Sequence, residues 1–235
     1  MIAVFDYDDT VVATQPVYDK AKQVFKHILH CAGIDVDNIV QRLDELDRLR
    51  VTYRGLRPER FIESMAITYA ILSARNEIPY DPAVDAAIHS LRHLLDVPPE
   101  PYPETTEVLK SLQERGHLLV LYSAAGDVEY QRRRIELSGI QGYFHHVVVT
   151  ATKDSDSFLR LLERIDAIDN PQRVVAVGNS YRSDILPALQ CGAKGVLIDR
   201  GDWQTPQQGE IDPNVPVLPS LEGLPELISQ FSKGK

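Results

Sequence analysis

Residues 2–10 of the chain read Ile-Ala-Val-Phe-Asp-Tyr-Asp-Asp-Thr, so an apolar run is followed at once by three carboxylates within four positions. A short apolar run of this kind predicts a buried β-strand. Three carboxylates at its end would repel one another unless a cation or a shared proton relieved them. Magnesium, a hard ion that prefers oxygen ligands, meets that need. An ordinary acidic turn at the end of a strand is the alternative.

Four more apolar runs resemble the first, and helical stretches lie between the later ones. Glycine or polar residues stand where each helical stretch begins or ends. This alternation predicts an α/β fold, a Rossmann-like parallel five-stranded sheet with helices on both faces. The predicted strands are Ile2–Phe5, Leu118–Tyr122, His146–Val149, Val174–Val177 and Gly195–Ile198, and the predicted helices are Thr105–Arg115, Val128–Ser138, Ser155–Ile165 and Asp184–Gln190.

The interval between the first two strands is far longer than one crossover helix requires. Its patterns are helical, and a proline-rich stretch, Val97–Pro103, follows as a stiff return linker. We therefore expect an inserted all-helical cap domain at residues 13–100, with the α/β core formed by residues 1–12 and 101–235. The predicted cap helices run from Thr14 to His30, Val36 to Tyr53, Pro58 to Arg75 and Pro82 to Leu95.

Composition narrows the class of protein. The 235 residues carry a net charge of −9 with scattered lysines and arginines, which argues against a nucleic-acid partner. Cys31 and Cys191 lie far apart without a metal-binding pattern, so two reduced thiols and a cytoplasmic location are expected. No apolar run is long enough to span a membrane, and the first run lacks the basic flank of a signal peptide, so no membrane partner is expected.

Polar groups follow four of the predicted strands, and the carboxyl ends of parallel strands converge on one crevice. A serine hydroxyl and backbone N–H groups ahead of a helix can hold an anion, while Asn179 and Asp184 offer oxygen ligands. Taken singly, these groups could equally be turns, helix caps or a solvated lysine. In strand order they are the cluster from Asp6 to Thr10, then Ser123 and Ala124, then Lys153, then the stretch from Gly178 to Asp184.

In that order, the four stretches resemble the four motifs of the haloacid dehalogenase-like superfamily, over nearly the whole chain. The only large insertion lies between the first and second motifs, as in members of the phosphoglycolate phosphatase and β-phosphoglucomutase type. The first motif, Asp-x-Asp-x-Thr, and the fourth, Gly-Asn-Ser followed by Asp184, are the specific ones.

The resemblance implies a role for each position. Asp6 would attack phosphorus and form an aspartyl-phosphate, and Asp8 would act as general acid and then general base. Ser123, with Ala124 beside it, and Lys153 would hold the phosphoryl oxygens. The metal would be Mg²⁺, bound by Asp6, the backbone carbonyl of Asp8, and Asp184.

Asn179 departs from the family pattern, since many members have aspartate there. An amide removes one negative charge from the surroundings of the metal. Its carbonyl oxygen can still accept or bind a metal-coordinated water, so Asn179 is a possible ligand.

Asp8 favours a phosphatase over a dehalogenase, because an alkoxide leaving group needs a proton and a halide does not. The expected substrate is a small phosphorylated metabolite, which a lid would admit more readily than a protein. A phosphomutase is the same-fold alternative. A receiver-like phosphate-binding module or a non-catalytic protein is more remote, since the insertion has no place in a receiver. A monomer and a homodimer both remain open.

Weaker candidates lie outside the four motifs. Arg54 and Arg57 could grip a second anionic group on the substrate, although arginines paired with glutamates at a helix start are the simpler interpretation. The run Gln131–Arg134 is interpreted as a helix face near Glu129 and Glu136, without function. Trp203 and Glu210 belong to a loop after the fifth strand, for which packing is the simpler role.

Overall fold

The computed structural model describes residues 1–34, 37–55, 57–75, 77–201 and 211–233. The chain divides into two compact units, which we call the core unit and the helical unit. The core unit comprises Met1–Thr14, Pro99–Ala124 and Val128–Lys235, and the helical unit comprises Gln15–Pro98 and Ala125–Asp127.

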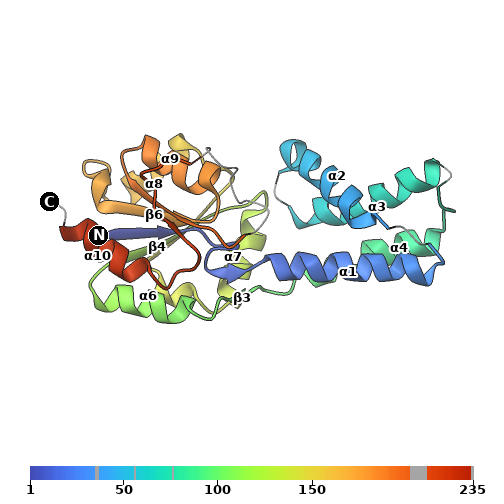
Figure 1. Cartoon of the computed structure of the whole chain (residues 1–235), viewed down its shortest axis with the longest axis horizontal. Coiled ribbons are helices and arrows are strands. Elements are labelled where there is room, and N and C mark those ends of the chain that lie inside the picture. The colour runs from blue at the N-terminus through green and yellow to red at the C-terminus, as the bar shows by residue number, and fades with distance from the viewer. Residues whose placement is uncertain (35–36, 56, 76, 202–210, 234–235) are drawn as a thin grey trace. The chain divides into compact units, whose positions relative to one another are not determined.

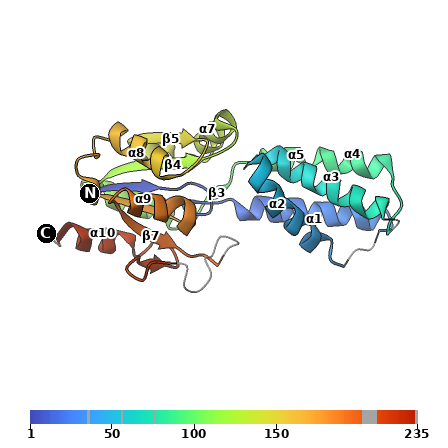
Figure 2. The same cartoon turned by 90° about the horizontal axis from the view of Figure 1, so that it is seen from above.

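The core unit contains a parallel sheet in the order β5-β4-β1-β6-β7-β8, with β1 between β4 and β6 (Figures 1 and 2). The five predicted strands are all present. A sixth, β8, was not predicted, because it has only two residues and stands between Pro216 and Pro219, where no apolar pattern can develop. The strands are β1 Ile2–Phe5, β4 Leu118–Ala124, β5 His146–Thr150, β6 Val174–Gly178, β7 Lys194–Ile198 and β8 Val217–Leu218.

Helices cover both faces of this sheet, as alternate side chains of β1 show. Ala3 and Phe5 belong to one buried cluster with residues of α6, α7 and α10, while Ile2 and Val4 belong to another with residues of α8 and α9. Burial on both faces explains why β1 is apolar throughout. Each fully buried large side chain contributes roughly 1.5–3 kcal/mol, so the strand ends are firmly placed. The helices are α6 Thr105–Glu114, α7 Val128–Leu137, α8 Ser155–Arg164, α9 Leu186–Gln190 and α10 Leu224–Lys233, the last of which was not predicted.

The helical unit has a hydrophobic core of its own, with Phe25, Leu43, Met65 and Ile88 fully buried. The predicted helix Pro82–Leu95 is divided at Leu91, and Val36, where another was expected to begin, lies outside the described residues. None of the helices in the described ranges is long and apolar enough to cross a membrane. The helices of this unit are α1 Gln15–Cys31, α2 Ile39–Arg54, α3 Pro58–Ala74, α4 Pro82–Ser90 and α5 Arg92–Leu95.

A two-stranded ribbon lies where the chain leaves and re-enters the core unit. In it, β2 (Val12–Ala13) pairs antiparallel with β3 (Glu100–Pro101). The Thr105 hydroxyl donates to the Val11 carbonyl oxygen at 2.8 Å and ties the ribbon to α6. The predicted return linker therefore contains a strand. Because the ribbon belongs to the core unit, the helical unit begins and ends slightly inside the predicted limits of 13 and 100.

Candidate active site

The loop after β1 is a tight turn that separates its three carboxylates. The Asp6 backbone N–H donates to the Val177 carbonyl oxygen at 2.9 Å, which fixes the start of the loop on β6. Asp9 has a φ of 57°, a left-handed conformation that aspartate tolerates better than most residues. The Asp9 carboxylate accepts the Thr14 backbone N–H at 2.9 Å. Asp9 thus stabilises the loop, because its left-handed backbone forms the turn and its carboxylate accepts a backbone hydrogen bond.

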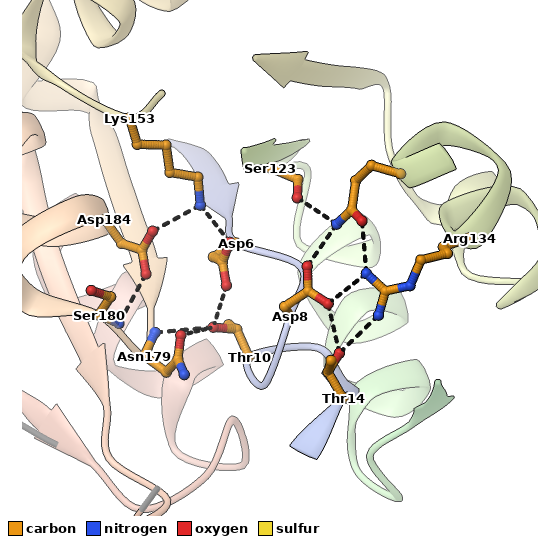
Figure 3. Close-up of polar contacts among 11 residues, drawn as sticks. Asp6, Asp8, Thr10, Thr14, Ser123, Arg134, Lys153, Asn179, Ser180 and Asp184 are labelled. Carbon is orange, nitrogen blue, oxygen red and sulfur yellow. Dashed lines mark hydrogen bonds and ion pairs between the residues drawn. The ribbon is translucent and has the colours of Figure 1, made fainter. Parts of the chain in front are cut away.

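Three predicted residues form a buried charged centre at this end of the sheet (Figure 3). The Lys153 ammonium donates both to Oδ1 of Asp6 and, at 2.8 Å, to Oδ1 of Asp184. The side chains of Lys153, Asp6 and Asp184 are 4%, 10% and 5% exposed. Asp6, Lys153 and Asp184 belong to the first, third and fourth predicted groups. These groups therefore lie together, with both carboxylates bound to the Lys153 ammonium.

The electrostatics of this centre leave an excess of negative charge. Burial raises the pKa of Asp6 to about 7; Lys153 opposes this shift, and the carboxylates of Asp184 and Asp8 add to it. Burial acts to lower the pKa of Lys153, but the carboxylates of Asp184 and Asp6 outweigh burial and hold that pKa above its ordinary value. One ammonium thus balances the charge of only one of the two carboxylates, and a proton or a second cation can neutralise the other negative charge.

Thr10 connects Asp6 to Asn179. The Thr10 hydroxyl lies 3.1 Å from Oδ2 of Asp6 as a donor, and it accepts the Asn179 backbone N–H at 3.0 Å. The amide oxygen of Asn179 lies 3.5 Å from the same hydroxyl. Asn179 is 3% exposed and belongs to the site. Thr10 bridges Asp6 and Asn179, a role that was not predicted.

Asp184 lies in a π-helical turn, Tyr181–Ile185, a feature that often marks functional sites. The predicted helix start at Asp184 is thus this turn, and α9 begins at Leu186. The Ser180 backbone N–H donates to Oδ2 of Asp184 at 2.9 Å. A Cβ placed on Gly178 would lie 2.5 Å from Cβ and Cγ of Asp184, so only glycine permits this approach.

Asp8 contacts a separate set of residues (Figure 3). Its Oδ1 accepts the Thr14 hydroxyl at 2.6 Å and lies 2.9 Å from Nη1 of Arg134. Its Oδ2 accepts Nε2 of Gln131 at 2.6 Å, and the same nitrogen donates to the Ser123 hydroxyl oxygen at 2.9 Å. Gln131 therefore links Asp8, the predicted general acid and base, to Ser123, the predicted phosphate-binding residue.

The interpretation of Gln131–Arg134 as a surface helix face is wrong for its two end residues. Gln131 and Arg134 are 2% and 9% exposed, whereas Arg132 is exposed and lies beside Glu129 as expected. The sequence contains one signal of this burial. Gln131 precedes the apolar, buried Ile135 by four positions and therefore shares its helix face.

The remaining predicted residues lie as follows. Ser123 is 1% exposed, and Ala124 beside it ends β4. Arg54, in the helical unit, is largely exposed, and its Nη2 lies 3.7 Å from Oε2 of Glu63. This contact agrees with the simpler interpretation, in which the arginine pairs with a glutamate. Arg57 is exposed at the start of α3. Trp203 and Glu210 lie outside the described residues.

The donor set at Asp6 and Asp184 suits Mg²⁺. Among the described residues, no three Asp, Glu, His or Cys side chains gather into a ready-made metal centre. Magnesium, however, usually takes only one or two carboxylates and keeps several waters. Asp6 and Asp184 already face one cationic group, and the neutral oxygen of Asn179 lies close by. Asp6 and Asp184, with the backbone carbonyl of Asp8 and with Asn179 as a possible neutral donor, are therefore the residues that could hold the ion.

The chain belongs to the haloacid dehalogenase-like hydrolase family, which it matches over residues 1–192. It is 25% identical, over 95% of its length and 97% of the relative, to a glyceraldehyde 3-phosphate phosphatase of Methanothermobacter thermautotrophicus. The solved structure of a haloacid dehalogenase-like family hydrolase from Xanthomonas campestris has a TM-score of 0.78 and 24% identity, covering 98% of this chain and 91% of that one. A putative hydrolase of the family from Bacillus subtilis, solved bound to magnesium, has a TM-score of 0.68 and 16% identity, covering 97% and 98%. These two structures show the fold.

Gly178→Ala should lower the free energy of unfolding by about 1–3 kcal/mol, because the added methyl group forces the Asp184 side chain to move. Chemical denaturation measures the change. Gly142→Ala is the control, since a Cβ there meets no atom within 4 Å, and a change within about 0.5 kcal/mol is expected. Equal effects at both positions would show that the approach of Asp184 to residue 178 is not tight.

Without divalent metal, Asp6→Asn should raise the melting temperature at pH 8 and change it little at pH 4. The folded-state pKa of about 7 exceeds the unfolded value, so the protonated form of Asp6 favours folding and this stabilisation is lost as pH rises through about 7. Asparagine mimics the protonated form at every pH. A gain of a few degrees corresponds to roughly 1 kcal/mol in a chain of this size. Asp169→Asn, at an exposed turn, is the control; no difference between the pH profiles of wild type and Asp6→Asn would contradict the shifted pKa.

Proposed function

We propose that this hydrolase removes the phosphoryl group from a small phosphorylated metabolite, with Mg²⁺ as cofactor and Asp6 as covalent nucleophile. The observation that carries the proposal is the buried contact of the Lys153 ammonium with the carboxylates of Asp6 and Asp184. Asp6 lies at the end of the central strand β1, and Asp8 follows it by two positions. A centre of buried, opposed charges costs stability, and such centres concentrate at functional sites.

The glyceraldehyde 3-phosphate phosphatase relative supports phosphatase chemistry, because it is similar to this chain over nearly the full length of both. The compound in its name is a small phosphorylated metabolite. We propose a substrate of that class, with no nucleic acid or membrane as partner, and a monomer or homodimer as the working form. Both cysteines are free thiols, which suits the cytoplasm.

In the proposed reaction, an oxygen of Asp6 attacks phosphorus and the ester oxygen leaves with a proton from Asp8. Water then attacks the aspartyl-phosphate, Asp8 takes its proton, and inorganic phosphate is released while Asp6 is restored. Lys153 offsets the negative charge that develops on the phosphoryl oxygens, and the Ser123 hydroxyl donates to one of them. Magnesium, when bound, supplies further electrostatic stabilisation of the transferring group.

Asp8 is the residue that separates the two chemistries of the family, which takes its name from dehalogenases. A halide leaves without a proton, whereas an alkoxide needs one. The contacts of Asp8 with Thr14, Gln131 and Arg134 hold its carboxylate in a defined place, as a proton-transfer group requires. We therefore favour ester hydrolysis over dehalogenation.

A phosphomutase is the alternative on the same fold, since its first step would use the same residues. The accumulation of an isomerised sugar phosphate in place of inorganic phosphate would identify it. A receiver-like module is disfavoured, because the helical unit, which we propose acts as a lid, has no counterpart in it.

A screen of phosphorylated metabolites should show release of inorganic phosphate that requires Mg²⁺. Excess chelator or Asp6→Asn should reduce the rate by at least about 10³-fold, because each removes the nucleophilic step or its electrostatic support. Phosphate release is measured colorimetrically, with Asp169→Asn as the matched control. Turnover that persists in Asp6→Asn would rule out the covalent route.

Asp8→Asn should separate substrates by leaving group. We expect kcat/KM for a simple alkyl phosphate to fall about 10²–10⁴-fold, the usual contribution of a general acid, and kcat/KM for 4-nitrophenyl phosphate to fall much less. The reason is that nitrophenolate departs without a proton. Equal losses with both esters would mean that Asp8 does not protonate the leaving group.

A further inference from the structure

Gln131 and Arg134 take no part in the proposed reaction steps, although both are buried and both contact Asp8. We propose that they are positioning residues, which hold the Asp8 carboxylate for proton transfer and set the Ser123 hydroxyl as a donor to the substrate. This inference rests on the proposed phosphatase function and adds two residues to it.

Arg134 is held from several sides within the core unit. Its guanidinium carbon lies 5.5 Å from the centre of the Tyr7 ring and 5.8 Å from that of Tyr130. The Tyr7 hydroxyl donates to the Arg134 backbone oxygen at 3.0 Å, so the residue between Asp6 and Asp8 also fixes this point of α7. A guanidinium packed against aromatic rings loses less freedom when it pairs with a carboxylate, and it is a rigid support for Asp8.

Arg134 also fixes the orientation of the Gln131 amide. Nη1 of Arg134 donates to Oε1 of Gln131 at 2.7 Å. The amide nitrogen must then face the other way, where Asp8 and Ser123 accept its two hydrogens. A flipped amide would set its oxygen against the Asp8 carboxylate and its NH₂ against the guanidinium. The hydrogen-bond pattern therefore admits one orientation.

This orientation determines what Ser123 and Asp8 can do. Because the Ser123 oxygen accepts from Gln131, the Ser123 hydroxyl hydrogen can point toward a phosphoryl oxygen. The Gln131 nitrogen and the Arg134 guanidinium can only donate, so neither can take a proton from Asp8. Neither group therefore competes with the leaving oxygen for a proton on Asp8, and both stabilise the ionised form that accepts a proton from water.

The kinetic test uses Gln131→Leu and Arg134→Met with an alkyl phosphate and 4-nitrophenyl phosphate. Each variant should lower kcat/KM for the alkyl ester at least about 10-fold more than for the aryl ester, since the defect lies in proton transfer. Arg134→Lys, which keeps a charged donor, should recover part of the loss. Arg132→Met, at an exposed position of the same helix, should behave as wild type. Equal losses for both esters would show that Gln131 and Arg134 do not position Asp8 for proton transfer.

A second measurement decides the inference even if no phosphate ester is hydrolysed by the wild type, an outcome that would refute the proposed function. Melting temperatures are compared for Asp8→Asn, Arg134→Met and the double variant. If Arg134 holds Asp8, the double variant should lose less than the sum of the two single losses, because each single variant already breaks the ion pair between them and the double variant can break it only once. Strictly additive losses would show that the two residues do not support each other.

Discussion

The site depends on one interaction, the contact of the Lys153 ammonium with the carboxylates of Asp6 and Asp184. Burying charges costs several kcal/mol per ion, and the imbalance of two carboxylates against one ammonium adds to that cost. A packed apolar group would serve stability better. The fold nevertheless assembles this centre from three distant stretches of chain, at the carboxyl ends of β1, β5 and β6 or in the loops that follow them. Buried, opposed charges of this kind concentrate at functional sites.

Two carboxylates only two residues apart lie in different surroundings, just ahead of the turn at Asp9. Asp6 faces Lys153, and Asp8 faces Thr14, Gln131 and Arg134. Asp9 makes the turn possible through its left-handed backbone and its hydrogen bond to Thr14. Pairs of titratable groups placed in unlike environments are how one site runs nucleophilic and proton-transfer chemistry together.

The sequence predicted the sheet from strong local patterns, and it predicted the residues of the charged centre from their order after the strands and from the resemblance to the four family motifs. Strands buried on both faces are apolar throughout, and polar groups after parallel strands must converge, so Asp6, Lys153 and Asp184 could be found. The β8 strand could not, since two residues carry no period. Gln131 and Arg134 were missed because a charged helix is normally solvated. Both contact Asp8, more than 120 positions away along the chain, and only the folded structure shows these contacts.

The most direct measurement of the central claim is to trap the covalent intermediate. The enzyme is acid-quenched during turnover with Mg²⁺ and a hydrolysed ester, and then treated with borohydride, which reduces an aspartyl-phosphate to homoserine. Peptide mapping by mass spectrometry should find homoserine at position 6 and at no other aspartate, since Asp6 is the carboxylate at the end of β1 that accepts a hydrogen bond from Lys153. Reduction at a different residue, or none during demonstrated turnover, would contradict the assignment of Asp6 as nucleophile.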